Sequence, residues 1–164
     1  MGELESEIRA RRADATDVRA LRAFRCDRGG WFARDVQRLI RGRIASAVAS
    51  TDPVEVVLFE RGGELAAVAV LEIDESAPAL CDLHVVAIAN KHQGSYVPTP
   101  AGQQPLVKVV LDSALAVARE LGAASLQTIV ASRNTRSIRM LAREGFVRIR
   151  KFDRDYDEYA VRLS

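Results

Sequence analysis

Residues 80–121 read LCDLHVVAIA, NKHQGSYVPTPAGQQP and LVKVVLDSALAVAREL, and this stretch decides the fold. The first block is apolar except for Asp82 and His84, which predicts a strand buried on both faces. The second block holds two glycines and three prolines, which predicts a loop without regular structure. The third block has apolar residues at helical spacing and ends before Gly122, which predicts a helix over 106–121.

This order of elements also suggests where function lies. A buried strand that leads through a glycine-bearing loop into a helix N-terminus offers backbone N–H groups and the positive end of a helix dipole to an anion. The sequence therefore places its strongest functional signal in the loop and the strand end that precedes it.

Regular elements are predicted on both sides of this segment. Two glycines, Gly62 and Gly63, separate two apolar runs and predict a β-hairpin. The expected elements are strand 7–12, helix 15–25, helix 31–49, strands 54–60 and 64–73, strand 124–131, helix 135–144, and strands 146–151 and 158–163. The order β-α-α-β-β-β-α-β-α-β-β predicts one α/β domain over 1–164, with a mixed sheet and helices on both of its faces.

Composition narrows the class of protein. The chain has 164 residues, is 48% hydrophobic and 28% charged, and carries a net charge of +2. Of its 24 Lys and Arg residues, 21 are arginine. We attribute this excess of arginine over lysine to the base composition of the genome and not to a surface that binds phosphates, so nucleic acid is not the expected partner. No apolar run approaches the roughly 20 residues that cross a bilayer, and no signal core is seen, so we expect a cytoplasmic protein with no membrane partner. Two cysteines and two histidines, widely separated, predict neither a disulfide framework nor a metal site.

The segment NTRSIRMLAREGF, residues 134–146, carries a resemblance to a known family. An Asn that opens a helix, and a Gly-Phe pair that ends it and starts a strand, are similar to the same segment of the GNAT acyltransferase superfamily. The order of elements resembles that family over nearly the whole chain. The resemblance implies an N-acyltransferase that moves an acetyl group from acetyl-CoA to an amine acceptor. The last strand is also placed where it can pair across a homodimer.

The resemblance further implies which residues contact acetyl-CoA. In the family, the end of the central strand holds the pantetheine arm, and loop N–H groups bind the pyrophosphate. Carried over to this chain, the cofactor-binding residues are Val86, Ala87 and Ile88 at the strand end, Gln93, Gly94, Ser95 and Gly102 in the loop, and Asn134 at the later helix.

The loop departs from the family pattern, which is Gln/Arg-x-x-Gly-x-Gly/Ala running directly into the helix. Here Gln93-Gly94 is followed by an insertion, and Gly102 is the only second glycine. Three prolines also remove N–H donors. The chain binds CoA through an altered loop, orders the loop only with ligand, or has lost the cofactor.

Three residues are candidates for catalysis. Asp82 stands where several family members place a base, and His84 lies two residues on, on the same face of a strand. Such a pair can act as a base or water relay, or it can be a polar pair satisfied within the sheet. The family's usual acid, a Tyr, is replaced by Leu141, and Tyr96 is the substitute considered.

Two other functions compete with the acyltransferase. A catalytically silent GNAT-like binding module would explain the interrupted loop and the missing Tyr. An acetyltransferase acting on aminoacyl-tRNA would use Arg34, Arg38 and Arg41 of the second predicted helix as a phosphate-contacting face.

Overall fold

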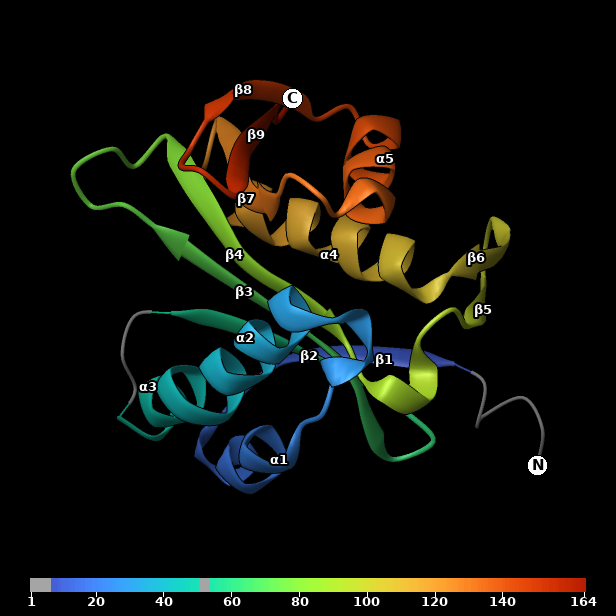
Figure 1. The fold of residues 1–164 in the computed structure, drawn as a ribbon. Helices are drawn as coiled ribbons and strands as arrows, with labels where there is room; N and C mark the ends of the chain where they lie inside the picture. The colour runs from blue at the N-terminus through green and yellow to red at the C-terminus, as the bar shows by residue number, and fades with distance from the viewer. Residues whose placement is uncertain (1–6, 51–53) are drawn as a thin grey trace. The chain divides into compact units, whose positions relative to one another are not determined.

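The computed structural model describes residues 7–50 and 54–164 (Figure 1). Most of the predicted elements are present, with bounds that differ by a few residues. The strands are β1 (Ile8–Arg12), β2 (Glu55–Arg61), β3 (Glu64–Ile73), β4 (Leu80–Ile88), β5 (Tyr96–Thr99), β6 (Gly102–Pro105), β7 (Ser125–Ala131), β8 (Val147–Lys151) and β9 (Tyr156–Arg162). The helices are α1 (Val18–Ala23), α2 (Trp31–Leu39), α3 (Ala45–Ser50), α4 (Leu106–Glu120) and α5 (Thr135–Arg143), and a π-helical turn (Ile40–Ile44) joins α2 to α3.

The strands form a seven-stranded sheet in the order β1-β2-β3-β4-β7-β9-β8, and β5 and β6 form a separate two-stranded sheet. Strand β4 pairs parallel with β7, whereas β1–β2, β7–β9 and β8–β9 pair antiparallel. The sheet is therefore mixed, and the predicted α/β class is confirmed. By its internal contacts the chain divides into a first unit, Met1–Val70 with Val85–Ser113, and a second unit, Leu71–His84 with Ala114–Ser164. A single domain over 1–164 stays a prediction.

The first unit has a core between its strands and α1–α3, which lie on one side of the strands (Figure 1). Apolar residues at helical spacing on α1 and on the α2–α3 segment pack against alternate residues of β2, β3 and β4. This cluster consists of Leu21, Phe24, Cys26, Ile40, Ile44, Ala45, Val56, Leu58, Val68, Val70, Val85 and Ala87. The intervening residues Val57, Phe59, Ala67 and Ala69 are buried as well, so both faces of this part of the sheet are covered.

The second unit is built around β7, β9 and β8. Leu126 of β7, Tyr159 of β9 and Leu141 of α5 are buried in it. Helix α5 ends as its sequence predicts, because Gly145 adopts φ 88° and the N–H of Phe146 donates to the carbonyl of Leu141.

Strand β4 corrects the first expectation. Its odd-numbered residues from Cys81 to Ala87 are buried, but Leu80, Asp82, Val86 and Ile88 are only half-buried and His84 is exposed. The strand is thus fully buried on one face and not on both. The long apolar run concealed this alternation, because half-buried Val and Ile stand on the more open face beside Asp82 and His84.

The prediction that residues 90–105 have no regular structure was wrong. A short 3₁₀ turn, Asn90–His92, is followed by a β-hairpin in which Tyr96 pairs with Pro105 and Pro98 with Gln103. Only alternate pairs of an antiparallel ladder exchange hydrogen bonds. Pro105 and Pro98 lie two pairs apart in this ladder. The alternate pairs, Val97–Gln104 and Thr99–Gly102, contain no proline, so the hairpin can form despite the missing N–H groups.

Candidate functional site

Strand β4 runs past the end of its ladder with β7. The last pair of that ladder is Leu83–Thr128, and the hydroxyl of Thr128 donates to the carbonyl of Leu83 (2.9 Å). Five residues of β4, from His84 to Ile88, follow this last pair. A strand end that outruns its neighbour leaves main-chain groups along one edge where an extended ligand can pair.

His84 contacts a carboxylate, but not the predicted one. Its Nε2 lies 2.7 Å from Oε2 of Glu72, which is on β3, and both side chains are a little over one-third exposed. Asp82 is half-buried on β4 and forms no side-chain hydrogen bond within the described residues. The structure therefore pairs His84 with Glu72 of β3 and not with Asp82, and the catalytic roles of Asp82 and His84 stay predictions. Sequence reasoning missed Glu72 as the partner because the contact depends on how β3 pairs with β4.

The turn after β4 is fastened to the segment between α1 and α2. The N–H of Asn90 donates to the carbonyl of Arg25, and its Nδ2 donates to Oδ1 of Asp27 (2.6 Å). Its Oδ1 accepts from the N–H of Arg28 (3.2 Å). The bond from Asn90 is the main cause that holds the pKa of Asp27 below its usual range. Nothing in the local sequence marked Asn90 for these contacts, because Arg25, Asp27 and Arg28 all lie more than 60 residues earlier in the chain.

Gln93 belongs to the same arrangement. Its Nε2 donates to the carbonyl of Ile88 (3.2 Å) and lies 3.5 Å from the carbonyl of Cys26. Cys26 is buried, and loss of solvation raises the pKa of its thiol to about 11. The side chain of Gln93 therefore closes the end of β4 and braces the turn, and the Cys26 thiol is held in its unreactive protonated form at neutral pH.

The main-chain donors between β4 and α4 are largely used within the turn. The N–H of His92 donates to the carbonyl of Ala89, and both the N–H and the hydroxyl of Ser95 donate to the carbonyl of His92 (3.2 and 2.6 Å). The N–H of Leu106, the first residue of α4, donates to the carbonyl of Ser95 (2.9 Å). Gly94, at φ 74°, is exposed, with open space where a Cβ would stand. Of the predicted loop residues, Ser95 thus has its donors engaged.

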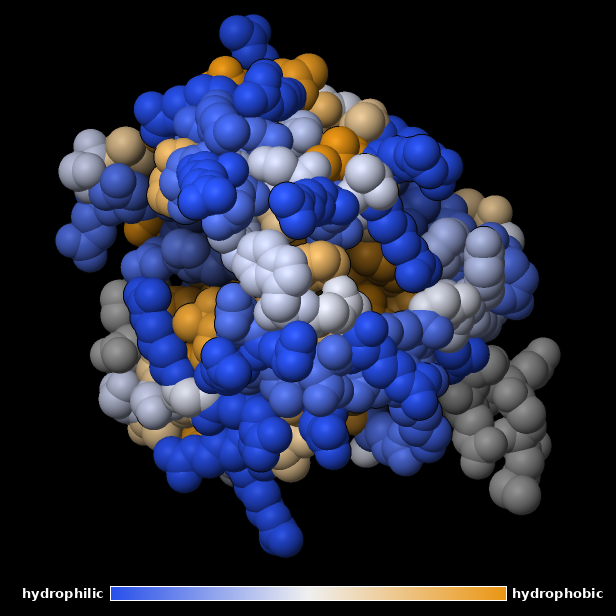
Figure 2. All heavy atoms as spheres, in the orientation of Figure 1, coloured by the Kyte–Doolittle hydropathy of each residue, from blue (hydrophilic) through white to orange (hydrophobic). Residues whose placement is uncertain are grey.

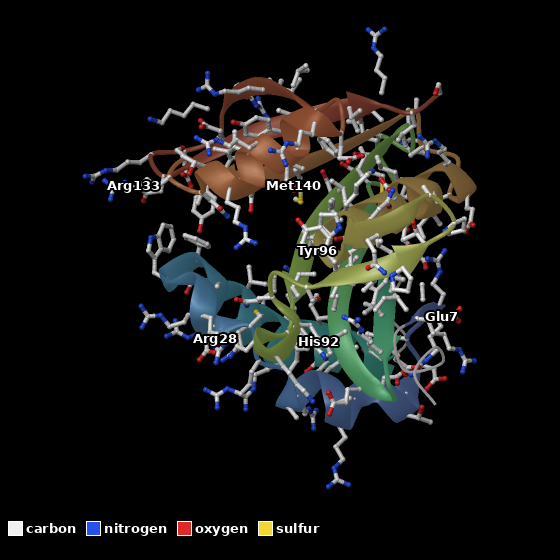
Figure 3. The ribbon with its side chains drawn as sticks, turned by 90° about the vertical axis from the view of Figure 1, so that its right-hand side faces the viewer. Glu7, Arg28, His92, Tyr96, Arg133 and Met140 are labelled. Carbon is white, nitrogen blue, oxygen red and sulfur yellow. The ribbon has the colours of Figure 1, made fainter. Side chains whose placement is uncertain are left out.

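The hairpin separates the remaining predicted residues. Tyr96 is 59% exposed at the base of the hairpin, close along the chain to His92 (Figure 3). Gly102 is at the opposite end, where it pairs with Thr99 and its carbonyl accepts from the Thr99 hydroxyl (2.7 Å). The structure therefore does not place Gly102 beside Gly94, and their shared role in binding a cofactor stays a prediction.

Asn134 and Leu141 belong to α5. The Oδ1 of Asn134 accepts from the N–H of Ser137 (3.2 Å), so this side chain caps the helix as its position predicts. Leu141, which replaces the family's Tyr, is 4% exposed and belongs to the core. A cofactor contact of Asn134 stays a prediction, whereas its structural role is explicit.

The arginines of the α2–α3 segment lie on its solvent side. Arg34, Arg38 and Arg41 are all exposed, at a spacing that puts them along one side of the helix. The surface over α2 is largely hydrophilic (Figure 2). Arg38 forms a 3.4 Å ion pair with Asp35 one turn away, as expected of a solvated helix face.

The described residues also bear on membrane-spanning and metal-binding classes of protein. None of their helices is long and apolar enough to cross a membrane. In the same residues, no group of three or more His, Cys, Asp or Glu side chains is arranged to hold a metal ion.

Solved structures resemble this chain over nearly its whole length. A GNAT-family acetyltransferase from Streptococcus pneumoniae matches with a TM-score of 0.69 and 18% identity, covering 96% of this chain and all of the other. PaiA N-acetyltransferase from Thermoplasma acidophilum, solved with coenzyme A, matches with a TM-score of 0.72 and 12% identity, covering 95% and 99%. The ribosomal-protein-S18-alanine N-acetyltransferase from Escherichia coli matches with a TM-score of 0.70 and 17% identity, covering 96% and 95%.

Sequence comparison alone does not reach this result, since no protein-family model and no curated protein matches the chain. The matched structures are less than 20% identical to this chain, so the match shows its fold alone. The chain has the GNAT fold, and the resemblance inferred from residues 134–146 is confirmed at that level.

Proposed function

We propose that the protein is an N-acyltransferase that transfers an acetyl group from acetyl-CoA to an amine. The observation that carries the proposal is strand β4. Its ladder with β7 ends at Leu83, and the next residue, His84, is hydrogen-bonded to the carboxylate of Glu72. The GNAT fold, and the coenzyme A in the Thermoplasma structure, support the choice of donor.

The thioester arm has a matching surface in the first unit. Val86 and Ile88 are half-buried on the more open face of β4, and Ala87 points into the core. An extended pantetheine arm carries amide groups that can pair with the edge of such a strand, as an added strand would. In this proposal Val86, Ala87 and Ile88 hold the arm mainly through their main chain.

His84 is proposed as the base. An amine attacks the thioester carbonyl only after its ammonium form has lost a proton, and an imidazole is suited to accept that proton. Because Nε2 faces the carboxylate of Glu72 at 2.7 Å, Nδ1 is the nitrogen left to receive it. Glu72 then acts as a positioning residue that fixes the tautomer and stabilises the charged ring.

The reaction balances in its bonds and protons. His84 takes the first proton from the ammonium before attack and passes it to water. The N–C bond then forms as the C–S bond breaks, the nitrogen releases its second proton to His84, and the leaving thiolate takes up one proton. Water is the proposed proton donor, and Tyr96, whose side chain is exposed in the first unit, stays the donor that the sequence suggests. Asp82 remains the second candidate for the base.

The proposal is tested by following free thiol release from acetyl-CoA against a panel of small amines and N-terminal peptides. His84→Gln should lower kcat by about 10²-fold or more, the usual size of a lost general base. Glu72→Gln should lower kcat less and leave KM for acetyl-CoA unchanged, and Asp82→Asn on the same strand tests the second candidate for the base. Unchanged kcat in His84→Gln, with a large loss in Asp82→Asn, would move the role to Asp82.

The silent binding module is the second candidate, and one observation favours it. The donors of Ser95 and Leu106 are engaged within the chain, where the family presents loop donors to a pyrophosphate. It predicts that no amine stimulates thiol release. The aminoacyl-tRNA acceptor is a third candidate, supported by the row of exposed arginines, and it predicts RNA binding that weakens steeply with salt.

A further inference from the structure

We propose that the donor site recognises the pantetheine arm of an acyl thioester and does not recognise the diphosphate of coenzyme A. The inference rests on the proposed function and concerns the donor that it uses. It predicts that S-acetylpantetheine, which has the thioester arm without the diphosphate and adenosine, replaces acetyl-CoA with a loss below about 100-fold.

The first argument is the use of main-chain donors. A diphosphate is normally held by successive N–H groups at the start of a helix, which must point outward and be unoccupied. Here the N–H of Leu106 is bonded to the carbonyl of Ser95, and the N–H groups of Ser95 and His92 are bonded within the preceding turn. These three donors, which lie between the end of β4 and the first residue of α4, are therefore already occupied.

The second argument is that this arrangement is anchored. Val97, on the first strand of the hairpin, and Leu106, the residue that follows its second strand, are each 1% exposed. The hairpin is paired throughout, from Tyr96–Pro105 to Thr99–Gly102. Freeing the donors of Ser95 and Leu106 would require breaking three hydrogen bonds and displacing two buried side chains. A diphosphate therefore cannot form hydrogen bonds with these donors unless the turn first rearranges.

The third argument is charge. Residues 92–107 contain no Lys or Arg. The lysines on either side are engaged, since Lys91 lies 2.8 Å from Oε2 of Glu64 and Lys108 lies 3.0 Å from Oδ2 of Asp112. The bond from Lys91 is the main cause that lowers the pKa of Glu64, so this carboxylate stays charged beside its lysine.

The surface proposed to bind the pantetheine arm is unaffected by the hairpin. Strand β4 still carries Val86 to Ile88 beyond its ladder with β7, and the hairpin begins eight residues after Ile88. The two halves of coenzyme A therefore meet different chemistry in this chain. The chemical step is unaltered with the shorter donor: the C–S bond breaks, and pantetheine leaves as the thiol in place of coenzyme A.

The test compares binding and turnover of the two donors by the full chain. Equilibrium binding is measured by calorimetry with coenzyme A and with pantetheine, and kcat/KM with acetyl-CoA and with S-acetylpantetheine on one amine. Two charge-assisted hydrogen bonds to a diphosphate correspond to about 100-fold or more in affinity. We expect both ratios to be below about 100, and either ratio above it overturns the inference.

Three outcomes separate this inference from the proposed function. Binding of coenzyme A and of pantetheine, with affinities that differ by less than about 100-fold, supports both proposals. Binding of coenzyme A alone contradicts the inference and leaves the acyltransferase standing. Binding of neither contradicts both, because no donor site then exists.

Two further measurements address the diphosphate directly. Free ADP, which carries a diphosphate without the arm, should not inhibit turnover at millimolar concentration, and inhibition at micromolar concentration would overturn the inference. Arg28 is the matched variant, because its N–H is bonded to Asn90 of the same turn. Arg28→Gln should change kcat/KM for the two donors by the same factor, whereas a loss confined to acetyl-CoA would show that its guanidinium reads the phosphates.

Discussion

Helices α4 and α5 begin in opposite ways. Helix α5 starts at a local signal, since Oδ1 of Asn134 accepts from the N–H of Ser137 three residues later. The residue before α4 is Pro105, whose side chain has no acceptor, and the first N–H of the helix donates to the carbonyl of Ser95, eleven residues earlier and across a hairpin. The first start is specified by one residue, and the second by the packing of an inserted element.

The largest expected effect is at the start of α4. Leu106→Ala removes a side chain that is 1% exposed and leaves a cavity where the hairpin joins the helix. We expect a loss of about 3 kcal/mol in the free energy of unfolding. The measurement is urea denaturation followed by circular dichroism. Val107→Ala, at the next and only half-buried position, is the control and should cost about 1 kcal/mol or less.

The end of α5 comes next. Gly145 adopts φ 88°, and a Cβ added there would meet only the Val161 side chain at 3.7 Å, an ordinary contact. Gly145→Ala should therefore cost about 1 to 2 kcal/mol through backbone strain alone. Gly42→Ala is a control of opposite sign, because Gly42 lies in a helical segment with open space around it and should gain up to about 1 kcal/mol. An unchanged free energy of unfolding in Gly145→Ala would show that the positive φ of this residue does not contribute to ending α5.

The start of α5 should respond to its cap. Asn134→Ala removes the acceptor for the Ser137 N–H and should cost about 1 kcal/mol, measured by thermal unfolding. Asn134→Ser restores a capping oxygen and should recover most of that loss. If both variants lose the same amount, the stability of this start does not come from the cap.

The smallest effect is expected at Ser95. Ser95→Ala removes the hydroxyl that donates to the carbonyl of His92, but that carbonyl still accepts from the Ser95 N–H, and the Ser95 carbonyl still accepts from Leu106. Because no buried group is left unsatisfied, the expected cost is about 0.5 kcal/mol. A loss above about 1.5 kcal/mol would mean that side chains, and not the main chain, hold the start of α4.

The same contrast explains what could be predicted from sequence. The hairpin at Gly62-Gly63, the Asn134 cap and the Gly145 stop were predictable because each depends on residues a few positions apart. The hairpin between Tyr96 and Pro105 was not, because its prolines resemble a broken loop until their register places them at alternate pairs. Glu72 beside His84, and Asn90 beside Asp27, were missed because these contacts join distant parts of the chain.

The central claim is that the chain binds a coenzyme A thioester, and thermal unfolding with and without acetyl-CoA tests it most directly. A ligand present at 100 times its Kd stabilises the folded state by about 2.7 kcal/mol. The account predicts a rise in Tm that grows with acetyl-CoA concentration, and a similar rise with coenzyme A. An unchanged Tm at millimolar concentrations of both would contradict it and favour the silent binding module.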